Sequence, residues 1–152
     1  MIRSRFQGSK RLTEKLRRIP REQRRDVGDA IVAGGAELQG AARRGIQQGG
    51  RSGEDYVRYN PKRSGTASAP GEFPKTDQGA LVRSIFNDVD PDRLGTEVGS
   101  GLGYAGDLED GTQNLEARPW LRPTFDALRE KLRQRIVKAA IRWAERAARD
   151  KR

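Results

Sequence analysis

The sequence predicts an α+β domain: a small antiparallel sheet packed by a long N-terminal helix and a long C-terminal helix, with a long Gly/Pro-rich loop or arm. Apolar residues recur at helical spacing near both ends, a short section between them alternates like strands, and glycine and proline interrupt the remainder. A length of 152 residues with 34% hydrophobic content fits one domain with a modest core, so a large multi-domain enzyme is excluded.

The N-terminal region, residues 1–47, is predicted to be helical. Pro20 suits a first helical turn, and the apolar stripe after it predicts an amphipathic helix over about residues 20–47. The stripes before and after Pro20 consist of Leu12, Leu16 and Ile19, and of Val27, Ile31, Gly34, Leu38 and Ala41. Because a glycine costs about 1 kcal/mol relative to alanine inside a helix, Gly34 and Gly35 predict close approach of another backbone.

Residues 48–79 are predicted to be a long loop. Six glycines and three prolines punctuate them, and no helical or strand period continues through them. Loops of this length are uncommon in compact domains and are either functional or disordered. Tyr56, Tyr59 and Phe73 favour an arm that becomes ordered on a partner, with a flexible insertion as the alternative.

Residues 80–112 form the predicted β section. Alternation over residues 81–86 predicts one strand, and Thr96-Glu97-Val98 predicts a second, so we expect a hairpin or a small antiparallel sheet. Residues 104–109 are too few to assign to helix or strand.

The C-terminal region, residues 118–150, contains the clearest element. Its spacing predicts a basic amphipathic helix from about Pro123 to Ala148. From both sections we expect a core that consists of Leu81, Ile85, Val98, Leu108, Trp120, Leu121, Phe125, Leu128 and Leu132.

Charge lies in three blocks. Residues 1–51 carry 13 Lys/Arg against 5 Asp/Glu, residues 52–117 carry 6 against 12, and residues 118–152 carry 12 against 4. The net charge of +10 suits a polyanion, but basic ends and an acidic middle can equally pair between neighbouring copies. We expect a chain that is soluble and intracellular when made, because the sequence shows no long apolar run and no apolar leader.

Catalytic and metal-binding groups are few. The sequence has no Cys and no His, which removes thiolate metal sites and the commonest general base, so we expect no enzyme, metal or cofactor. The Gly99–Gly103 run does not fit a dinucleotide-binding turn and is predicted to be a strand-to-strand loop. The adjacent acids Glu109 and Asp110 are interpreted as surface charge.

Five short segments occur in an order that is more specific than any one of them. They are Ala67–Pro74 (ASAPGEFP), Thr76–Ile85 (TDQGALVRSI), Val98-Gly99, Tyr104-Ala105 with Leu108–Thr112 (LEDGT), and Ala117–Pro123 (ARPWLRP). In this order they resemble the small neck or tail-completion proteins, also called head-tail joining proteins, of long-tailed double-stranded DNA bacteriophages and prophages. The resemblance covers roughly residues 50–130 and departs at Gln78, where the family usually has Thr, and at Asp110, where an aromatic residue is common.

The resemblance implies a structural virion protein that forms a hexameric or dodecameric ring at the head-tail junction, as a neck, tail-completion or tail-terminator protein. Its expected partners are upstream head connector proteins, a tail-tube or tail-completion protein and, non-specifically, packaged DNA, with no membrane. Its expected location is the virion neck, with assembly in the host cytoplasm. A basic nucleic-acid-binding protein is the alternative function.

The expected interface has two parts. One is an arm, pre-extended by its prolines, of Ser68, Ala69, Pro70, Gly71, Glu72, Phe73 and Pro74. The other gathers charged residues that would face an acidic partner or DNA, together with neighbouring charges: Glu109, Arg118, Arg122, Arg129, Arg133, Arg135 and Lys138.

Overall fold

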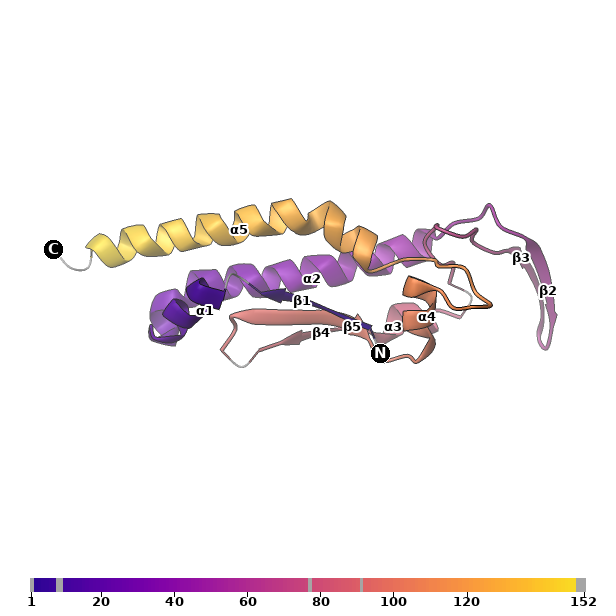
Figure 1. The fold of residues 1–152 in the computed structure, drawn as a ribbon, viewed down its shortest axis with the longest axis horizontal. Helices are drawn as coiled ribbons and strands as arrows, with labels where there is room; N and C mark the ends of the chain where they lie inside the picture. Colours follow the sequence, from indigo (N-terminus) through magenta and orange to yellow (C-terminus); the bar gives the residue numbers. More distant parts are fainter. Residues whose placement is uncertain (1, 8–9, 77, 91, 150–152) are drawn as a thin grey trace.

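The computed structural model describes residues 2–7, 10–76, 78–90 and 92–149. It confirms the predicted α+β class: α2 (Arg25–Gln48) packs lengthwise against α5 (Arg122–Arg149), and a three-stranded antiparallel sheet lies against α2. In Figure 1, α2 forms the middle layer of an elongated molecule, with α5 on one side and the sheet on the other.

The sheet has the order β1-β5-β4, formed by β1 (Ile2–Gln7), β5 (Gly95–Ser100) and β4 (Ile85–Val89). The central strand β5 places Val98 opposite Ser4 of β1 and opposite Asn87 of β4. The prediction of a helical N-terminal region is wrong for residues 2–7, which form β1, so the predicted hairpin is in fact a sheet with a third strand.

The strand predicted over residues 81–86 is wrong in its first half. Ala80–Ser84 form a short helix, α3, after Gly79, whose φ of 73° lies in the left-handed region that glycine favours. Leu81 and Ile85, which read as alternating strand positions, are both buried four residues apart, as one helical turn places them. A stretch this short fits both periods, and the turn at Gly79 decides between them.

The loop predicted over residues 48–79 contains a hairpin that the sequence analysis missed. β2 (Asp55–Tyr59) and β3 (Lys62–Thr66) pair antiparallel, and the hairpin projects from one end of the molecule (Figure 1). Residues on both faces of β2 are largely exposed, so the sequence lacks the alternation of apolar and polar residues that would predict this strand.

The remaining helices agree with the pattern. α1 (Lys10–Arg17) and a 3-10 helix (Arg21–Arg24) precede α2, and α4 (Tyr104–Asp110) occupies the segment left unassigned. The predicted range 123–148 matches α5 within one residue at each end, and the predicted range 20–47 covers α2 but begins five residues early, over the 3-10 helix.

Two neighbouring glycines of α2 allow close approach on opposite sides, Gly35 toward the sheet and Gly34 toward α5. A Cβ at Gly35 would lie 2.5 Å from Thr96 Oγ1 and 2.6 Å from Asn87 Oδ1 on the sheet. A Cβ at Gly34 would lie 3.3 Å from a methyl carbon of Leu132 on α5. The expected close approach is therefore real, although the approaching atoms are side chains and not backbone.

The core lies along both faces of α2 in two clusters. Of the nine predicted core residues, Leu81, Ile85, Val98, Trp120, Leu121 and Leu132 are buried, and Leu108, Phe125 and Leu128 pack partly buried against them. The larger cluster surrounds Trp120 and the C-terminal half of α2, and the smaller one joins Val27 and Ile31 to Leu16, Leu94 and Ala139.

One carboxylate ties α2 to α5. Glu37 accepts a hydrogen bond from Lys131 Nζ at 2.6 Å and forms an ion pair with Arg135 Nη2 at 2.7 Å. The hydrogen bond from Lys131 lowers the pKa of Glu37, burial opposes the shift, and the contact with Arg135 adds to it. This junction sits at the middle of the α2–α5 contact.

We predict that Gly35→Ala destabilises the fold while Gly40→Ala on the same helix does not. A methyl at position 35 must displace Thr96 and Asn87, at a cost of about 1–3 kcal/mol, which exceeds the gain of about 1 kcal/mol in helix propensity. At Gly40 the nearest atom is Nη1 of the flexible Arg44 side chain, so the propensity gain remains. Urea unfolding of both variants checks this, and equal stability changes would contradict it.

We predict that Glu37→Gln lowers the free energy of unfolding by about 1 kcal/mol at pH 7. Because the pKa of Glu37 is lowered by folding, this stabilisation is complete above the ordinary value of 4.5 and is lost as pH falls through the folded-state pKa. The stabilities of parent and variant therefore converge in acid. Urea titrations from pH 7 down to acid test it, and a difference that persists unchanged in acid refutes the assignment.

Candidate functional site

Glu109 is a structural anchor and not surface charge. Its side chain is 3% exposed, Oε2 accepts from the backbone N–H of Trp120 at 2.7 Å and of Leu121 at 2.8 Å, and Oε1 accepts from Arg122 at 2.7 Å. These N–H groups lie at the start of α5, where a helix leaves donors unpaired and favours negative charge. The interpretation of Glu109 as surface charge is therefore wrong.

The segments around Glu109 are joined to one another by further hydrogen bonds. Trp120, fully buried, donates from its indole Nε1 to the Ala105 carbonyl at 3.2 Å, and Thr124 Oγ1 donates to the Trp120 carbonyl at 2.6 Å. Arg118 N donates to the Leu108 carbonyl at 2.6 Å, and Gly111, with φ of 77°, turns the chain where a Cβ would meet Leu115 O at 2.9 Å. Residues 104–124 thus form one hydrogen-bonded unit, which we call the α4–α5 junction.

Residues 68–74 do not project as an arm. Ser68 and Pro74 are buried, and the Phe73 ring covers Gly45 near the end of α2. The segment is also bonded at its backbone, because Gly71 N donates to the Ala117 carbonyl at 2.8 Å and Arg118 Nε to the Ser68 carbonyl at 3.1 Å. Residues 68–74, predicted to be an arm, therefore pack against the rest of the chain, and we call them the strap. Arg118 helps to hold the strap in place through its hydrogen bond to Ser68.

Glu72 of this strap also bonds to its own chain. It accepts from Ser52 Oγ at 2.7 Å and from the Ala69 N–H at 2.8 Å. The hydrogen bond from Ser52 is the main reason that the pKa of Glu72 lies below its ordinary value.

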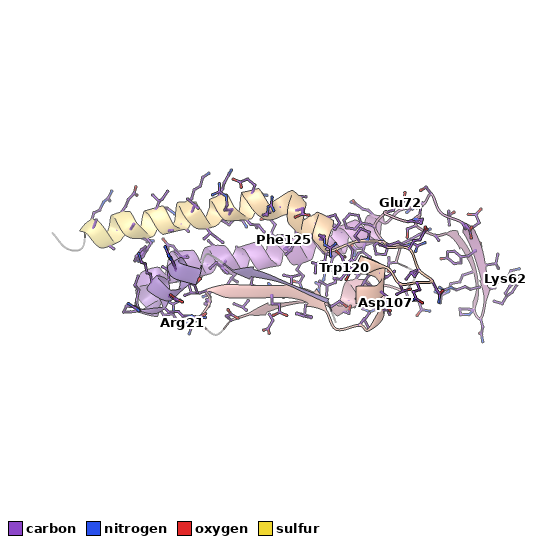
Figure 2. The ribbon with its side chains drawn as sticks, viewed as in Figure 1. Arg21, Lys62, Glu72, Asp107, Trp120 and Phe125 are labelled. Carbon is purple, nitrogen blue, oxygen red and sulfur yellow. The ribbon has the colours of Figure 1, made fainter. Side chains whose placement is uncertain are left out.

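What does project is the β2–β3 hairpin. Tyr59 is 81% and Val57 49% exposed, and both lie on one hairpin face, two residues apart. Tyr56 lies on the other face, where Arg58 stacks over its ring at 5.6 Å. Lys62 lies at the projecting end in Figure 2. One face of the hairpin thus exposes a tyrosine and a valine, although an isolated two-stranded hairpin is only marginally stable in water.

The basic residues singled out on α5 divide into two groups. Arg122 pairs with Asp110 at 2.9 Å, Arg133 with Glu130 at 2.8 Å, and Arg135 with Glu37. Arg129 and Lys138 are exposed on the same helix. Contacts within the chain thus use much of the charge that the sequence analysis assigned to partners.

Two exposed patches each combine apolar residues with charged ones, and the charges of the two patches have opposite signs. On the C-terminal half of α5, Val137 (44% exposed) and Ile141 (53%) lie beside exposed Lys138 and Arg142. On α4, Tyr104 (46%) lies near exposed Asp107 and Asp110, and Figure 2 shows Asp107 on the hairpin side of the molecule. We call these the basic patch and the acidic patch. α5 runs from the junction toward the opposite end, so the patches point toward different ends (Figure 1).

Among the described residues, no group of three or more acidic residues could hold a metal ion. The Gly99–Gly103 segment leads from β5 into α4, not into a strand as predicted, and Ser100 Oγ bonds to Ser84 Oγ at 2.7 Å and accepts from the Leu102 N–H. This serine is therefore engaged in holding the turn.

No family model, curated protein or solved structure matches the chain. In the part of the chain that the structure describes, no helix combines the length and hydropathy needed to cross a membrane.

We predict that Glu109→Gln destabilises the protein by about 2–3 kcal/mol, because an amide offers one acceptor oxygen where two are used and turns its NH₂ toward backbone donors. The matched control is Asp110→Asn, which removes an exposed ion pair with Arg122 and changes stability by no more than about 1 kcal/mol. Chemical denaturation measures both, and equal losses would disprove the anchoring role of Glu109.

Proposed function

We propose that this chain is a structural subunit of a ring at the head-tail junction of a long-tailed bacteriophage or prophage. The observation that carries the proposal is the α4–α5 junction. Two of the segments behind the family resemblance, residues 104–112 and 117–123, contact each other through Glu109 and Trp120. A third, residues 76–85, contains Ser84, which bonds to Ser100 beside the same core. Segments that are separate in sequence thus share one structural role.

The two patches suggest how copies would associate. The basic patch of one copy would meet the acidic patch of the next, so that Val137 and Ile141 are covered together with Tyr104. Such a contact joins two different surfaces, and contacts of this kind close into rings when the rotation between subunits allows it. Opposite charge would set the register and limit wrong pairings.

The hairpin takes the place of the arm expected at residues 68–74. It would reach the neighbouring subunit or the next ring, and its exposed Val57 and Tyr59 would be buried there. A small core makes stabilisation by neighbours effective, since binding to the folded state adds directly to stability.

A virus that encodes this chain provides the test of function. Removing the gene should leave DNA-filled heads and unjoined tails, and supplying the chain from a plasmid should restore complete particles. A chain with residues 55–66 replaced by a short Gly-Ser linker should fold, because this hairpin lies outside both core clusters, but should restore few particles. Complete virions without the gene would contradict the proposal.

We predict that Arg142→Glu and Asp107→Lys each weaken self-association at least tenfold, and that the double variant recovers much of it, because reversing both charges restores an attractive pair. Arg44→Glu and Asp88→Lys, exposed positions outside both patches, serve as controls of equal charge change. Light scattering at several salt concentrations measures the association. Double variants no better than singles would rule out this pairing of patches.

A further inference from the structure

An arginine-lined hollow of about 390 Å³ lies where the 3-10 helix meets α2. It is at the opposite end of the molecule from the hairpin, as the positions of Arg21 and Lys62 show in Figure 2. Two segments that are far apart in sequence form its walls: Arg21, Arg24, Arg25 and Gly28 from one, and Asp92 and Arg93 from the β4–β5 turn. The hollow takes no part in the proposed ring contact.

Arg24 is held rigidly in this wall. Its side chain is 7% exposed, Nε donates to the Ile19 carbonyl at 3.1 Å, and Nη1 donates to the Asp92 carbonyl at 2.6 Å. Both acceptors are neutral carbonyls, so these two bonds fix the position of the guanidinium without neutralising its charge. A buried charge of this kind is stabilised by a counter-charge nearby.

Arg93 is held from the other side. Its φ of 58° lies in the left-handed region, which side chains other than those of glycine, asparagine and aspartate rarely adopt. Its N–H donates to the Asp90 carbonyl at 2.8 Å, and a Cβ at Gly28 would lie 3.4 Å from the Arg93 Cβ. This strained turn therefore lies against α2 at Gly28.

Positive charge exceeds negative charge among the described side chains here. Asp92 pairs with Arg17 at 3.0 Å, and Asp29 pairs with Arg93 at 2.8 Å and more loosely with Arg25 at 3.6 Å. Four arginines and one carboxylate, that of Asp92, are among the described residues that line the hollow. The neighbouring Asp26 is itself paired with Arg146. A guanidinium has five N–H donors, and the contacts described use only some of them.

We propose that this hollow binds a phosphate group. Planar guanidinium groups bond to phosphate oxygens through two parallel N–H donors, and arginines from two segments can surround the tetrahedral oxygens. The same chemistry fits a free phosphate or a phosphodiester of a DNA backbone. The inference does not depend on the proposed ring, because one copy of the chain contains the whole hollow.

The test uses the full chain, with inorganic phosphate and a short DNA duplex as probes in calorimetric titrations at fixed ionic strength. The variant is Arg21→Gln with Arg25→Gln, two exposed hollow residues whose loss leaves the core intact. The control, Arg44→Gln with Arg51→Gln, makes the same charge change at exposed positions outside the hollow and outside both patches. Circular dichroism establishes that all three proteins are folded.

We expect saturable phosphate binding that the hollow variant weakens at least tenfold and the control at most twofold. If the duplex competes with phosphate and is weakened by the same variant, the ligand is a DNA backbone; if it does not compete, the ligand is a free phosphate. Either result supports the site. No saturable phosphate binding, or equal losses in both variants, overturns it.

Discussion

Three backbone N–H groups at the start of α5 converge on the single buried carboxylate of Glu109. The first turn of a helix cannot satisfy its own donors, and the Trp120 and Leu121 donors of this turn are buried. The carboxylate resolves both problems and fixes α4 to α5. The direction in which α5 leaves the α4–α5 junction then determines which of its residues meet α2. The two apolar clusters, the contacts of Glu37 with Lys131 and Arg135, and the position of the exposed basic patch all depend on that direction.

α2 is the second constraint, because it must pack on two sides. Gly35 lets Thr96 and Asn87 of the sheet approach, whereas Gly34 admits Leu132 of α5. Polar side chains of the same helix also bond to both neighbours. Gln39 and Arg43 donate to the Ile85 carbonyl of the sheet, and Glu37 accepts from Lys131 of α5. A helix used on two faces makes an extended molecule with a thin core. The hairpin lies outside both apolar clusters, and β1 and β4 are the outer strands of the sheet.

Charge is used in two ways. Pairs such as Lys131 with Glu37 and Arg17 with Asp92 join elements that are far apart in sequence. The remaining charge is separated in space, with arginines concentrated around the hollow at the N-terminal end of α2 and acidic residues on α4 at the other end. The proposed ring contact and the proposed phosphate site draw on different parts of this remainder, so the strongly basic composition need not imply one polyanionic partner along the whole surface.

By itself the sequence determined the α+β class, the two long helices, strand β5 and six buried residues of the core. The helices and these core residues follow from the period that a buried face imposes, and β5 follows from strand-forming residues between turn signals. Only the tertiary structure decided the rest. The β2–β3 hairpin buries little and therefore carries no apolar alternation, α3 depends on the turn at Gly79, and the strap of residues 68–74 is held by contacts with Gly45 and Arg118. Glu109 reads as one of two adjacent surface acids, and its role arises from a helix start eleven to thirteen residues later in the chain. A buried polar contact between distant segments leaves no periodic signal, since it depends on where the chain returns and not on what its neighbours are.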